Sequence, residues 1–399
     1  IRQKRCAAKP TRLQKSSKPK ISGPYSTAKL KVHKIYIDRD VAEWPVTRTI
    51  VSRLNRPVAY LDGPDELFQT IDGADDPQNY GKHLLWLTRN RGAFVRDCPG
   101  TSHYTCCNYE ILHIGTYCSM DCAYCILQAY FHPPVLQFFV NHQQMHESLD
   151  TLFASETIHR IGTGEFTDSL IWEPVYPIAE ELIHRFSAQH SAVLELKTKT
   201  ADVKSLLGLP HNQKTIMAWS LNTPRVIDTQ ERATAGLDQR IRAAAECRAR
   251  GYPLAFHFDP LVIYDGCENE YGRVIDRLFD AIDGDAVVWI SIGSFRFMPT
   301  LKPVIERRFS GSKIVYGEFV KGIDGKMRYF KPLRIALYRS IIAKIREKAP
   351  SVLLYFCMED DEVWQKSLGF CPDAAGGLPR MLDESAARHC GLQGRFRRH

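Results

Sequence analysis

The chain has 399 residues, of which 44% are hydrophobic and 25% are charged, as in an ordinary globular protein. This length accommodates two domains, or one large barrel with additions. No apolar run reaches the roughly 18 residues that a membrane helix needs, so the sequence excludes a spanning protein. The twelve cysteines are too dilute for a disulfide scaffold.

The positive charge is concentrated at the amino end. Residues 1–34 contain eleven Lys or Arg and no Asp or Glu, so the net charge of +8 originates in this segment. A flexible arm of this kind can hold nucleic acid electrostatically. Equally, it fits an expression remnant, a targeting segment or a solvated tail. We interpret residues 1–32 as a basic flexible tail.

After the tail, the apolar pattern predicts a small α/β domain over residues 33–107. Residues 33–41 alternate like a strand, and residues 47–54 have helical spacing. Residues 57–62 fit a second strand, and residues 81–92 fit a third strand that ends in a basic turn.

From residue 108 onward, strand-like and helix-like segments alternate. Strands are expected at residues 110–115, 159–166, 192–200, 215–222, 253–263 and 287–295. Helices are expected at residues 144–154, 174–188, 203–209, 236–251 and 272–282. Repeated β-then-α units imply parallel strands and right-handed crossovers. Six units predict a partial (β/α)6 barrel of the TIM type within residues 108–348.

The last part of this segment predicts a hairpin. Residues 313–332 contain two strand-like stretches around Gly322 and Gly325. A helix from about Leu333 to Lys348 and a strand over residues 352–358 follow. The rest of the C-terminal extension, residues 349–399, shows no firm pattern.

Three closely spaced cysteines carry the strongest chemical signal. Cys118, Cys122 and Cys125 form the pattern C-x3-C-x2-C in TYCSMDCAYCILQAY. Three thiolates on a 4Fe–4S cluster leave one iron open, whereas electron-carrier clusters fill all four corners with cysteine. Zinc would require a fourth ligand, and neither His113 nor His132 completes a standard zinc pattern. The spacing is typical of radical S-adenosylmethionine enzymes, in which the open iron holds the amino and carboxylate groups of S-adenosylmethionine.

Polar residues follow the ends of the expected barrel strands, where parallel barrels hold their active sites. A lysine suits the carboxylate of S-adenosylmethionine, a glutamate suits its ammonium group, and Ser and Asn suit ribose hydroxyls. A tyrosine between the last two cluster cysteines commonly packs against adenine. The expected cofactor-binding residues are Tyr124, Glu165, Thr167, Asp168, Lys199, Ser220 and Asn222.

From about His33 to Tyr355, the chain resembles the spore photoproduct lyases, which are DNA repair photolyases of the radical S-adenosylmethionine type. The resemblance rests on IYIDRDVAEWPVTRTI, CSMDCAYCILQ, GLDQRIRAAAECRARGYPLAFHFDPLVIYDGCENEY and SFRFMPTLKPVIERRF. It implies a partial barrel behind a small α/β domain, with a 4Fe–4S cluster that reduces S-adenosylmethionine. The resulting 5′-deoxyadenosyl radical would abstract hydrogen from a thymine dimer in DNA.

The resemblance also assigns roles to residues. It implies that Lys199 and Ser220 help to hold S-adenosylmethionine, with Thr167 and Asp168 nearby. It further implies that the hairpin wedges into DNA beside a flipped-out lesion. The hairpin residues expected to touch nucleic acid, next to an exposed aromatic ring, are Lys326, Arg328 and Tyr329.

The chain departs from the family at the step that completes repair. In the family, a cysteine two residues before the Thr167 position donates hydrogen to the product radical. A tyrosine directly after the third cluster cysteine helps to return the radical. Here these two positions hold Glu165 and Ile126. Another donor is therefore expected, either the cofactor itself or a thiol from the set Cys106, Cys107, Cys267 and Cys357. Cys267 and Cys357 are the preferred catalytic thiols, and Cys267 ranks first because we expect it on a loop at the active-site mouth.

The sequence leaves three functions open. A family enzyme acting on DNA or another nucleic acid is favoured by the basic hairpin. A radical S-adenosylmethionine enzyme acting on a peptide, an RNA or a small molecule is favoured by the missing hydrogen relay. A non-catalytic iron–sulfur protein is disfavoured by the many potential cofactor contacts. Either enzyme would need an electron donor such as flavodoxin or ferredoxin, and an oxygen-sensitive cluster predicts the reducing cytoplasm.

Overall fold

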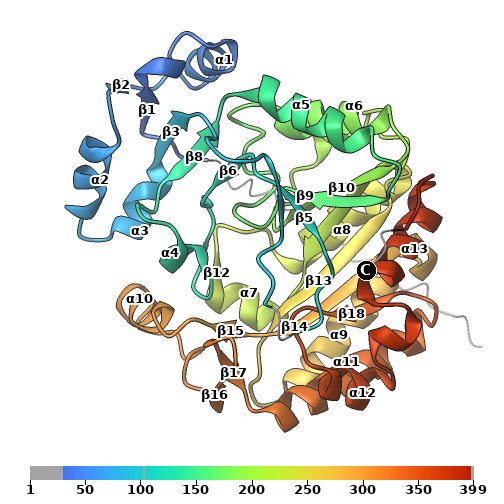
Figure 1. The fold of residues 1–399 in the computed structure, drawn as a ribbon. Helices are drawn as coiled ribbons and strands as arrows, with labels where there is room; N and C mark the ends of the chain where they lie inside the picture. Colours follow the sequence, from blue (N-terminus) through green and yellow to red (C-terminus); the bar gives the residue numbers. More distant parts are fainter. Residues whose placement is uncertain (1–29, 102–103, 397–399) are drawn as a thin grey trace, which may run out of the picture.

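The computed structural model describes residues 30–101 and 104–396, so the predicted basic tail lies almost entirely outside the described residues. Two sheets organise the fold, a small one near the amino end and a large curled one (Figure 1). Within the described residues, no helix is long and apolar enough to cross a membrane.

The small sheet contains the three strands expected near the amino end. In spatial order its strands are β2 Val58–Leu61, β1 Lys34–Asp38, β3 Leu84–Thr88, β8 Leu136–Phe139 and β6 Gly115–Thr116. The first four are parallel, and β6 is antiparallel to β8. Its helices are α1 Pro45–Leu54, α2 Asp65–Asp72 and α3 Pro77–Tyr80. Two of its strands therefore come from beyond residue 107, after the sequence of the predicted domain has ended.

The large sheet contains all six predicted barrel strands as neighbours in chain order. They are β5 Glu110–Leu112, β9 His159–Gly162, β10 Ala192–Thr198, β11 Thr215–Ser220, β13 Leu254–Leu261 and β14 Val287–Ser294. All six are parallel. β18 Leu354–Phe356 adds a seventh parallel strand beside β14, and β4 Val95–Asp97 pairs antiparallel with β5. The sheet curls without pairing its two edge strands, which makes it a partial barrel.

Burial explains why these strands read as apolar runs rather than as alternating ones. Every residue of β11 and of β14 is buried, as expected for parallel strands covered on both faces. The covering helices are α5 His142–Phe153, α6 Ile178–Ser187, α8 Leu237–Ala249, α9 Cys267–Phe279, α11 Lys331–Lys348, α12 Asp361–Leu368 and α13 Leu378–Cys390. One continuous apolar core joins these layers to the small sheet.

One predicted helix is wrong. Residues 203–209 form only a short 3-10 turn, Lys204–Leu206. Gly208 and Pro210 follow directly, and both residues disfavour continuation of a helix.

The predicted hairpin is confirmed. It consists of β16 Phe319–Lys321 and β17 Met327–Tyr329, and β17 also pairs with the short strand β15 Arg296–Phe297. Gly325 has a φ of +77°, which suits glycine at the turn. A separate apolar cluster packs Phe319 and Tyr329 against side chains that include Cys122 and Tyr124. The hairpin is therefore placed beside the cysteine loop.

Candidate active site

The three clustered cysteines lie on a loop that other elements hold in shape. The two-residue strand β7 Asp121–Cys122 pairs antiparallel with β12 Glu231–Arg232, which follows helix α7 Pro224–Gln230. The amide of Ala123 donates to Gln230 O at 2.7 Å. After Cys125, the short helix α4 Leu127–Tyr130 leads the chain away.

Two side chains satisfy the carbonyl groups of this loop. The buried ammonium of Lys82 donates to Cys118 O at 2.8 Å and to Met120 O at 2.7 Å. The amide of Gln128 donates to Cys122 O and Ala123 O, each at 3.1 Å, and to Cys125 O at 3.3 Å. These two side chains therefore hold the backbone of the cysteine loop in place.

The three cysteines of the loop interact electrostatically with one another. Among the described residues, no group of three or more His, Cys, Asp and Glu side chains is arranged as a site for a metal ion. Burial raises the pKa of Cys118 to about 12 and that of Cys122 well above its ordinary value. Both thiols keep their protons until a bound metal displaces them.

A buried charged network lies behind the loop. The Tyr124 hydroxyl donates to Glu231, whose other oxygen accepts from Arg240 at 2.5 Å. Burial acts to raise the pKa of Glu231, but the cations Arg240 and Lys199 outweigh it and lower the pKa overall. The Lys199 ammonium lies 5.8 Å from the centre of the Tyr124 ring. Among the described residues, no carboxylate lies within 4 Å of the Lys199 ammonium, although Glu231 and Asp168 interact with it electrostatically.

Glu165 and Lys199 were expected to clamp the two ends of the methionine group. Glu165 lies on the loop after β9, where its carboxylate is 3.4 Å from the Lys197 ammonium. Lys197 belongs to β10, and burial, which lowers its pKa, is outweighed by Glu165 and other carboxylates that raise it. Glu165 therefore already has a cationic partner, Lys197.

Two further predicted cofactor residues are engaged in internal hydrogen bonds. The Asp168 carboxylate accepts from the amides of Leu170 and Lys199 and from the Thr198 hydroxyl, at 3.0, 2.9 and 2.8 Å. Asn222 donates to Pro260 O at 2.8 Å and accepts from Tyr271 at 2.6 Å. These contacts position the loops around Lys199. Ser220 and Thr167 are both buried near them, on β11 and on the loop before Asp168.

The two preferred thiol donors occupy different places. Cys357 directly follows β18, and its sulfur accepts from Arg296 Nη2 at 3.5 Å. Arg296 in turn binds both oxygens of Asp259, each at 3.2 Å. Cys267 was expected on a loop, but it is the first residue of α9 and is fully buried, and its amide donates to Tyr264 O at 3.0 Å. Burial raises the pKa of each thiol to about 11, so both are protonated at neutral pH.

The expectation of an exposed aromatic ring on the hairpin is wrong. Tyr329 is 2% exposed and stacks on Phe319 with ring centres 4.4 Å apart. Arg328 is 3% exposed, because it pairs with Asp324 at 2.7 Å and donates to Met358 O at 3.0 Å. The hairpin instead exposes Ile323, at 68%.

A cleft of about 910 Å³ lies at the carboxyl ends of β1, β2 and β3. Its lining combines basic and aromatic side chains, including Arg39, Arg89, Arg91, Arg96, His113 and Phe131. The His113 ring is 8% exposed, and neither of its nitrogens has a hydrogen-bond partner among the residues that the structure describes. His113 and Phe131 both pack on Phe166, the neighbour of Glu165, so the cleft adjoins the barrel mouth.

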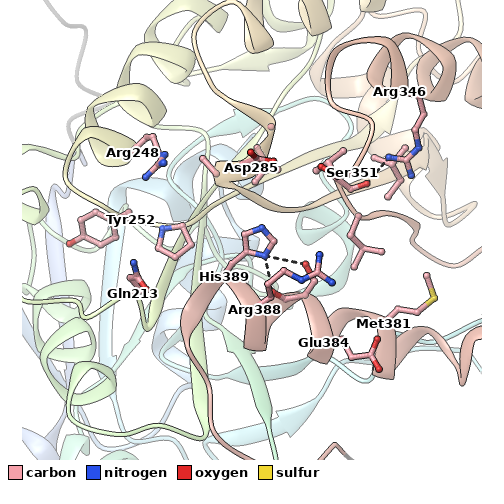
Figure 2. A pocket seen from close by; sticks show the side chains of 18 of the residues that line it. Gln213, Arg248, Tyr252, Asp285, Arg346, Ser351, Met381, Glu384, Arg388 and His389 are labelled. Atoms are coloured by element: carbon pink, nitrogen blue, oxygen red, sulfur yellow. Dashed lines mark hydrogen bonds between the residues drawn. The ribbon is translucent and has the colours of Figure 1, made fainter.

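A second cavity, of about 780 Å³, lies at the opposite ends of the strands. Its lining residues Gln213, Pro253 and Leu353 come just before β11, β13 and β18. Figure 2 shows Arg248, Arg346 and Arg388 around this cavity. Parallel barrels hold their chemistry at the other edge, so this cavity is separate from the candidate active site.

Several residues of the site were not identified from the sequence. Lys82 and Gln128 donate to backbone carbonyls, which every residue has, so no sequence pattern indicates these contacts. Glu231 and Arg240 are brought to Tyr124 by a two-residue strand pairing.

Comparisons with known proteins agree with this geometry. The model of the family described as "Spore photoproduct lyase" matches residues 33–331. A spore photoproduct lyase of Clostridium acetobutylicum is 26% identical over 312 residues, which cover 75% of this chain and 86% of that protein. A spore photoproduct lyase of Bacillus subtilis is 29% identical over 249 residues, covering 59% and 68%.

Among solved structures, the chain is similar to a spore photoproduct lyase mutant with bound AdoMet and dinucleoside spore photoproduct. The TM-score is 0.74 at 20% identity, covering 82% of this chain and 100% of that chain. Another spore photoproduct lyase, complexed with dinucleoside spore photoproduct, matches with a TM-score of 0.73 at 20% identity over the same shares. At this identity the match supports the fold: an α/β protein with a partial barrel.

Proposed function

The chain belongs to the spore photoproduct lyase family of radical S-adenosylmethionine lyases, and we propose that it acts on a thymine lesion in DNA. The family uses a 4Fe–4S cluster together with S-adenosylmethionine. The proposal also includes a boundary between an N-terminal α/β domain and a six-unit barrel at residues 107 and 108. It further includes a cytoplasmic location and an electron donor of the flavodoxin or ferredoxin type.

One observation carries the cofactor assignment. Three cysteines, two of them buried and one half-buried, share a loop whose carbonyls accept hydrogen bonds from Lys82 and Gln128, and the ammonium of Lys199 lies beside Tyr124 of this loop. In the proposal, Cys118, Cys122 and Cys125 hold the cluster, and Lys199 binds the S-adenosylmethionine carboxylate. Tyr124, fixed by Glu231, supplies an apolar face for the adenine. When bound, this cofactor pair supplies a 5′-deoxyadenosyl radical.

The remaining roles of the chain are to position the substrate and to exclude water. Asp168 and Asn222 hold the strand-end loops around the cofactor through internal hydrogen bonds. The buried pair Glu195–His257 and the half-buried pair Asp259–Arg296 lie on and beside the barrel strands. A dry and rigid interior limits side reactions of a radical and fixes its distance from the substrate hydrogen.

The cleft beside the barrel mouth supports a nucleic-acid substrate. Its arginines suit phosphate groups, and Phe131 offers a stacking surface. Arg39 and Arg89 are already paired with Asp62 and Asp40, whereas Arg91 is exposed. We propose that DNA backbone crosses this cleft while the lesion enters the barrel. Lys326, Arg328 and Tyr329 would then support the hairpin from within, and Ile323 at its exposed turn would approach the duplex.

A second function is favoured by Glu165. It stands where the family resemblance places the hydrogen-donating cysteine, and its carboxylate is bound to Lys197. Hydrogen abstraction from a substrate other than DNA would not need the family's donor. In either case, Cys267 and Cys357 stay the predicted protein donors.

Anaerobic reconstitution followed by turnover distinguishes the two functions. S-adenosylmethionine cleavage is measured alone, with untreated DNA and with UV-irradiated DNA of the same sequence. Acceleration by irradiated DNA alone, with loss of the photoproduct, supports the first function. Cleavage at one rate in all three samples contradicts a DNA substrate and supports the second.

A further inference from the structure

The cleft beside the barrel mouth has a floor that contact with a phosphate backbone does not require. Its volume of about 910 Å³ is in the range of sites that enclose a small molecule. The floor is one face of the small sheet, formed by Trp86 and Thr88 of β3 and by Gln137 and Phe139 of β8. Trp86 is in register with Gln137, and Thr88 with Phe139. An aromatic ring and an amide side chain therefore lie next to each other on this floor.

The cleft also lies where a sheet of this topology leaves a crevice. The chain goes from β1 to β2 on one side, and then crosses to β3 on the other side of β1, where β8 extends the sheet further. Ligands of such sheets bind outside the carboxyl ends of the strands, at the point where the strand order reverses. Arg39 follows β1, Arg89 and Arg91 follow β3, and all three line the cleft.

The ring and the amide on the floor are each held in place by a neighbour. Trp86 donates from Nε1 to the Asp38 carboxylate at 2.7 Å, and its ring is half-buried. The Thr116 hydroxyl donates to Gln137 Oε1 at 3.2 Å. Among the residues that the structure describes, the amide nitrogen of Gln137 has no hydrogen-bond partner. A fixed indole suits the flat face of a nucleobase, and a fixed amide donor suits its polar edge.

Aromatic rings continue from the floor of the cleft to the barrel mouth. Phe139 and His113 are edge-to-face with ring centres 4.8 Å apart, and His113 and Phe166 are edge-to-face at 5.0 Å. Phe131, which lines the cleft, also packs on Phe166, at 6.1 Å. Burial lowers the pKa of His113 to about 4, so its ring is neutral at neutral pH. These uncharged rings offer contact to bases rather than to phosphate groups.

From this geometry we propose that the cleft binds one nucleotide of an unpaired DNA strand while the lesion occupies the barrel. The base stacks on Trp86, its edge accepts a hydrogen bond from Gln137, and Arg91 contacts the phosphate. This inference rests on the proposed function, because it assumes a DNA substrate. It adds that the DNA is single-stranded or locally opened beside the lesion, since a base stacked inside a duplex cannot reach the floor of a cleft.

Tryptophan fluorescence of the reconstituted full chain tests this site, because Trp86 is part of it. The probes are thymidine 5′-monophosphate, a short single-stranded oligothymidylate, and the duplex of that strand with oligoadenylate, all without irradiation. We expect the single strand to quench part of the emission, the duplex to quench less, and the monophosphate to bind more weakly. Trp86→Phe should lose this quenching. Trp44→Phe, which replaces a half-buried tryptophan outside the cleft, should keep it.

Gln137→Ala tests the contact to the edge of the base. Loss of one neutral hydrogen bond should weaken the binding of a labelled oligothymidylate by about two- to tenfold, measured by fluorescence anisotropy. Gln143→Ala, at an exposed position of α5, is the matched control and should bind as the wild type does. The melting temperature of each variant shows that it is folded, and the quenching of the wild-type chain needs no variant.

Four results would overturn the proposal: full quenching in Trp86→Phe, equal binding by Gln137→Ala and Gln143→Ala, equal quenching by duplex and single strand, or equal affinity for monophosphate and strand. The last would assign the cleft to a free nucleotide. None of these readouts needs S-adenosylmethionine or a photoproduct. A chain that repairs the photoproduct without quenching of Trp86 overturns this inference alone. A chain that binds the strand in the cleft and repairs nothing overturns only the proposed function.

Discussion

The Lys82 ammonium lies 2.8 Å from the carbonyl oxygen of Cys118, although the two residues belong to different parts of the fold. Lys82 sits on the 3-10 turn Gly81–His83 that leads into β3 of the small sheet. The same ammonium also donates to Met120 O, so it joins two carbonyl groups at the start of the cysteine loop. The shape of the candidate cluster site thus depends on a side chain of the small sheet.

Replacement of Lys82 by Met should weaken the cluster site. Met has a similar length, but it leaves the carbonyls of Cys118 and Met120 buried without a donor, at about 1–3 kcal/mol each. We expect a lower melting temperature and faster iron loss, measured by calorimetry and by chelation with a ferrous chelator. Lys366→Met, which removes an exposed pair with Glu362, is the control. Equal melting and equal iron loss in both variants would contradict the role of Lys82.

Replacement of Cys118, Cys122 or Cys125 by Ala should abolish S-adenosylmethionine cleavage. Each change removes one thiolate from a cluster that has only three, and the iron content should fall by about four per chain. Cleavage is followed by chromatography of 5′-deoxyadenosine under anaerobic conditions. A variant that still produces 5′-deoxyadenosine at the wild-type rate would remove that cysteine from the ligand set.

Lys199→Ala should weaken S-adenosylmethionine binding and leave the iron content unchanged. Lys199 offers a cation beside Tyr124, and a charge-assisted hydrogen bond contributes about 1.5–3 kcal/mol, or about tenfold to a hundredfold in affinity. Isothermal titration of the reconstituted protein measures the change. Lys302→Ala, on the exposed face of α10 Leu301–Arg308, should bind as the wild type does. Unaltered binding in both variants would make Lys199 a structural residue.

Glu173 should make the protein less stable as the pH rises. Burial raises the pKa of Glu173 from its ordinary 4.5 to about 7. A carboxyl group whose pKa is higher in the folded state holds its proton more tightly there, so stability is lost as pH rises from about 4.5 through 7. At about 1.4 kcal/mol per pKa unit, the loss is on the order of 3 kcal/mol.

Glu173→Gln tests this dependence, because Gln keeps an acceptor for the amide of Ala179, now 2.7 Å from the carboxylate. Urea unfolding at pH 5 and pH 8 should show a smaller difference in the variant than in the wild type. Glu66→Gln, at an exposed position of α2, provides the comparison. A wild-type stability that does not fall between the two pH values would show that Glu173 is ionised in the fold.

Arg91→Ala should weaken binding to duplex DNA. Each phosphate contact that is lost lowers the slope of log K against log salt by about 1. Fluorescence anisotropy over a salt series measures both the affinity and the slope. Arg388→Ala, beside the cavity at the opposite strand ends (Figure 2), should leave both unchanged. An equal effect of the two substitutions would point to general charge rather than to the cleft.

The sequence predicts the elements that depend on local pattern. The six barrel strands and the Gly322–Gly325 turn of the hairpin are confirmed, because burial and turn geometry impose a pattern on neighbouring residues. The loop with Cys118, Cys122 and Cys125 was found for a similar reason, since three ligands of one cluster must lie close together in the chain.

Features that depend on distant contacts could not be predicted. The sequence predicts an exposed ring at Tyr329, but Phe319 stacks on it and an apolar cluster that includes Phe297 buries it. Residues 136–139 gave no signal as a strand, yet they pair with β3 across nearly fifty intervening positions.

The pairing of β3 with β8 has a consequence for synthesis on the ribosome. A nascent chain that has emerged only as far as residue 107 contains β1, β2 and β3, but β3 still presents an unpaired edge. Unpaired edges attract other strands, and transiently exposed ones favour misassembly. That edge is covered only when residues 136–139 leave the exit tunnel, after the cysteine loop has already emerged. Pausing of translation between these two points would therefore expose both the edge and the loop thiols at once.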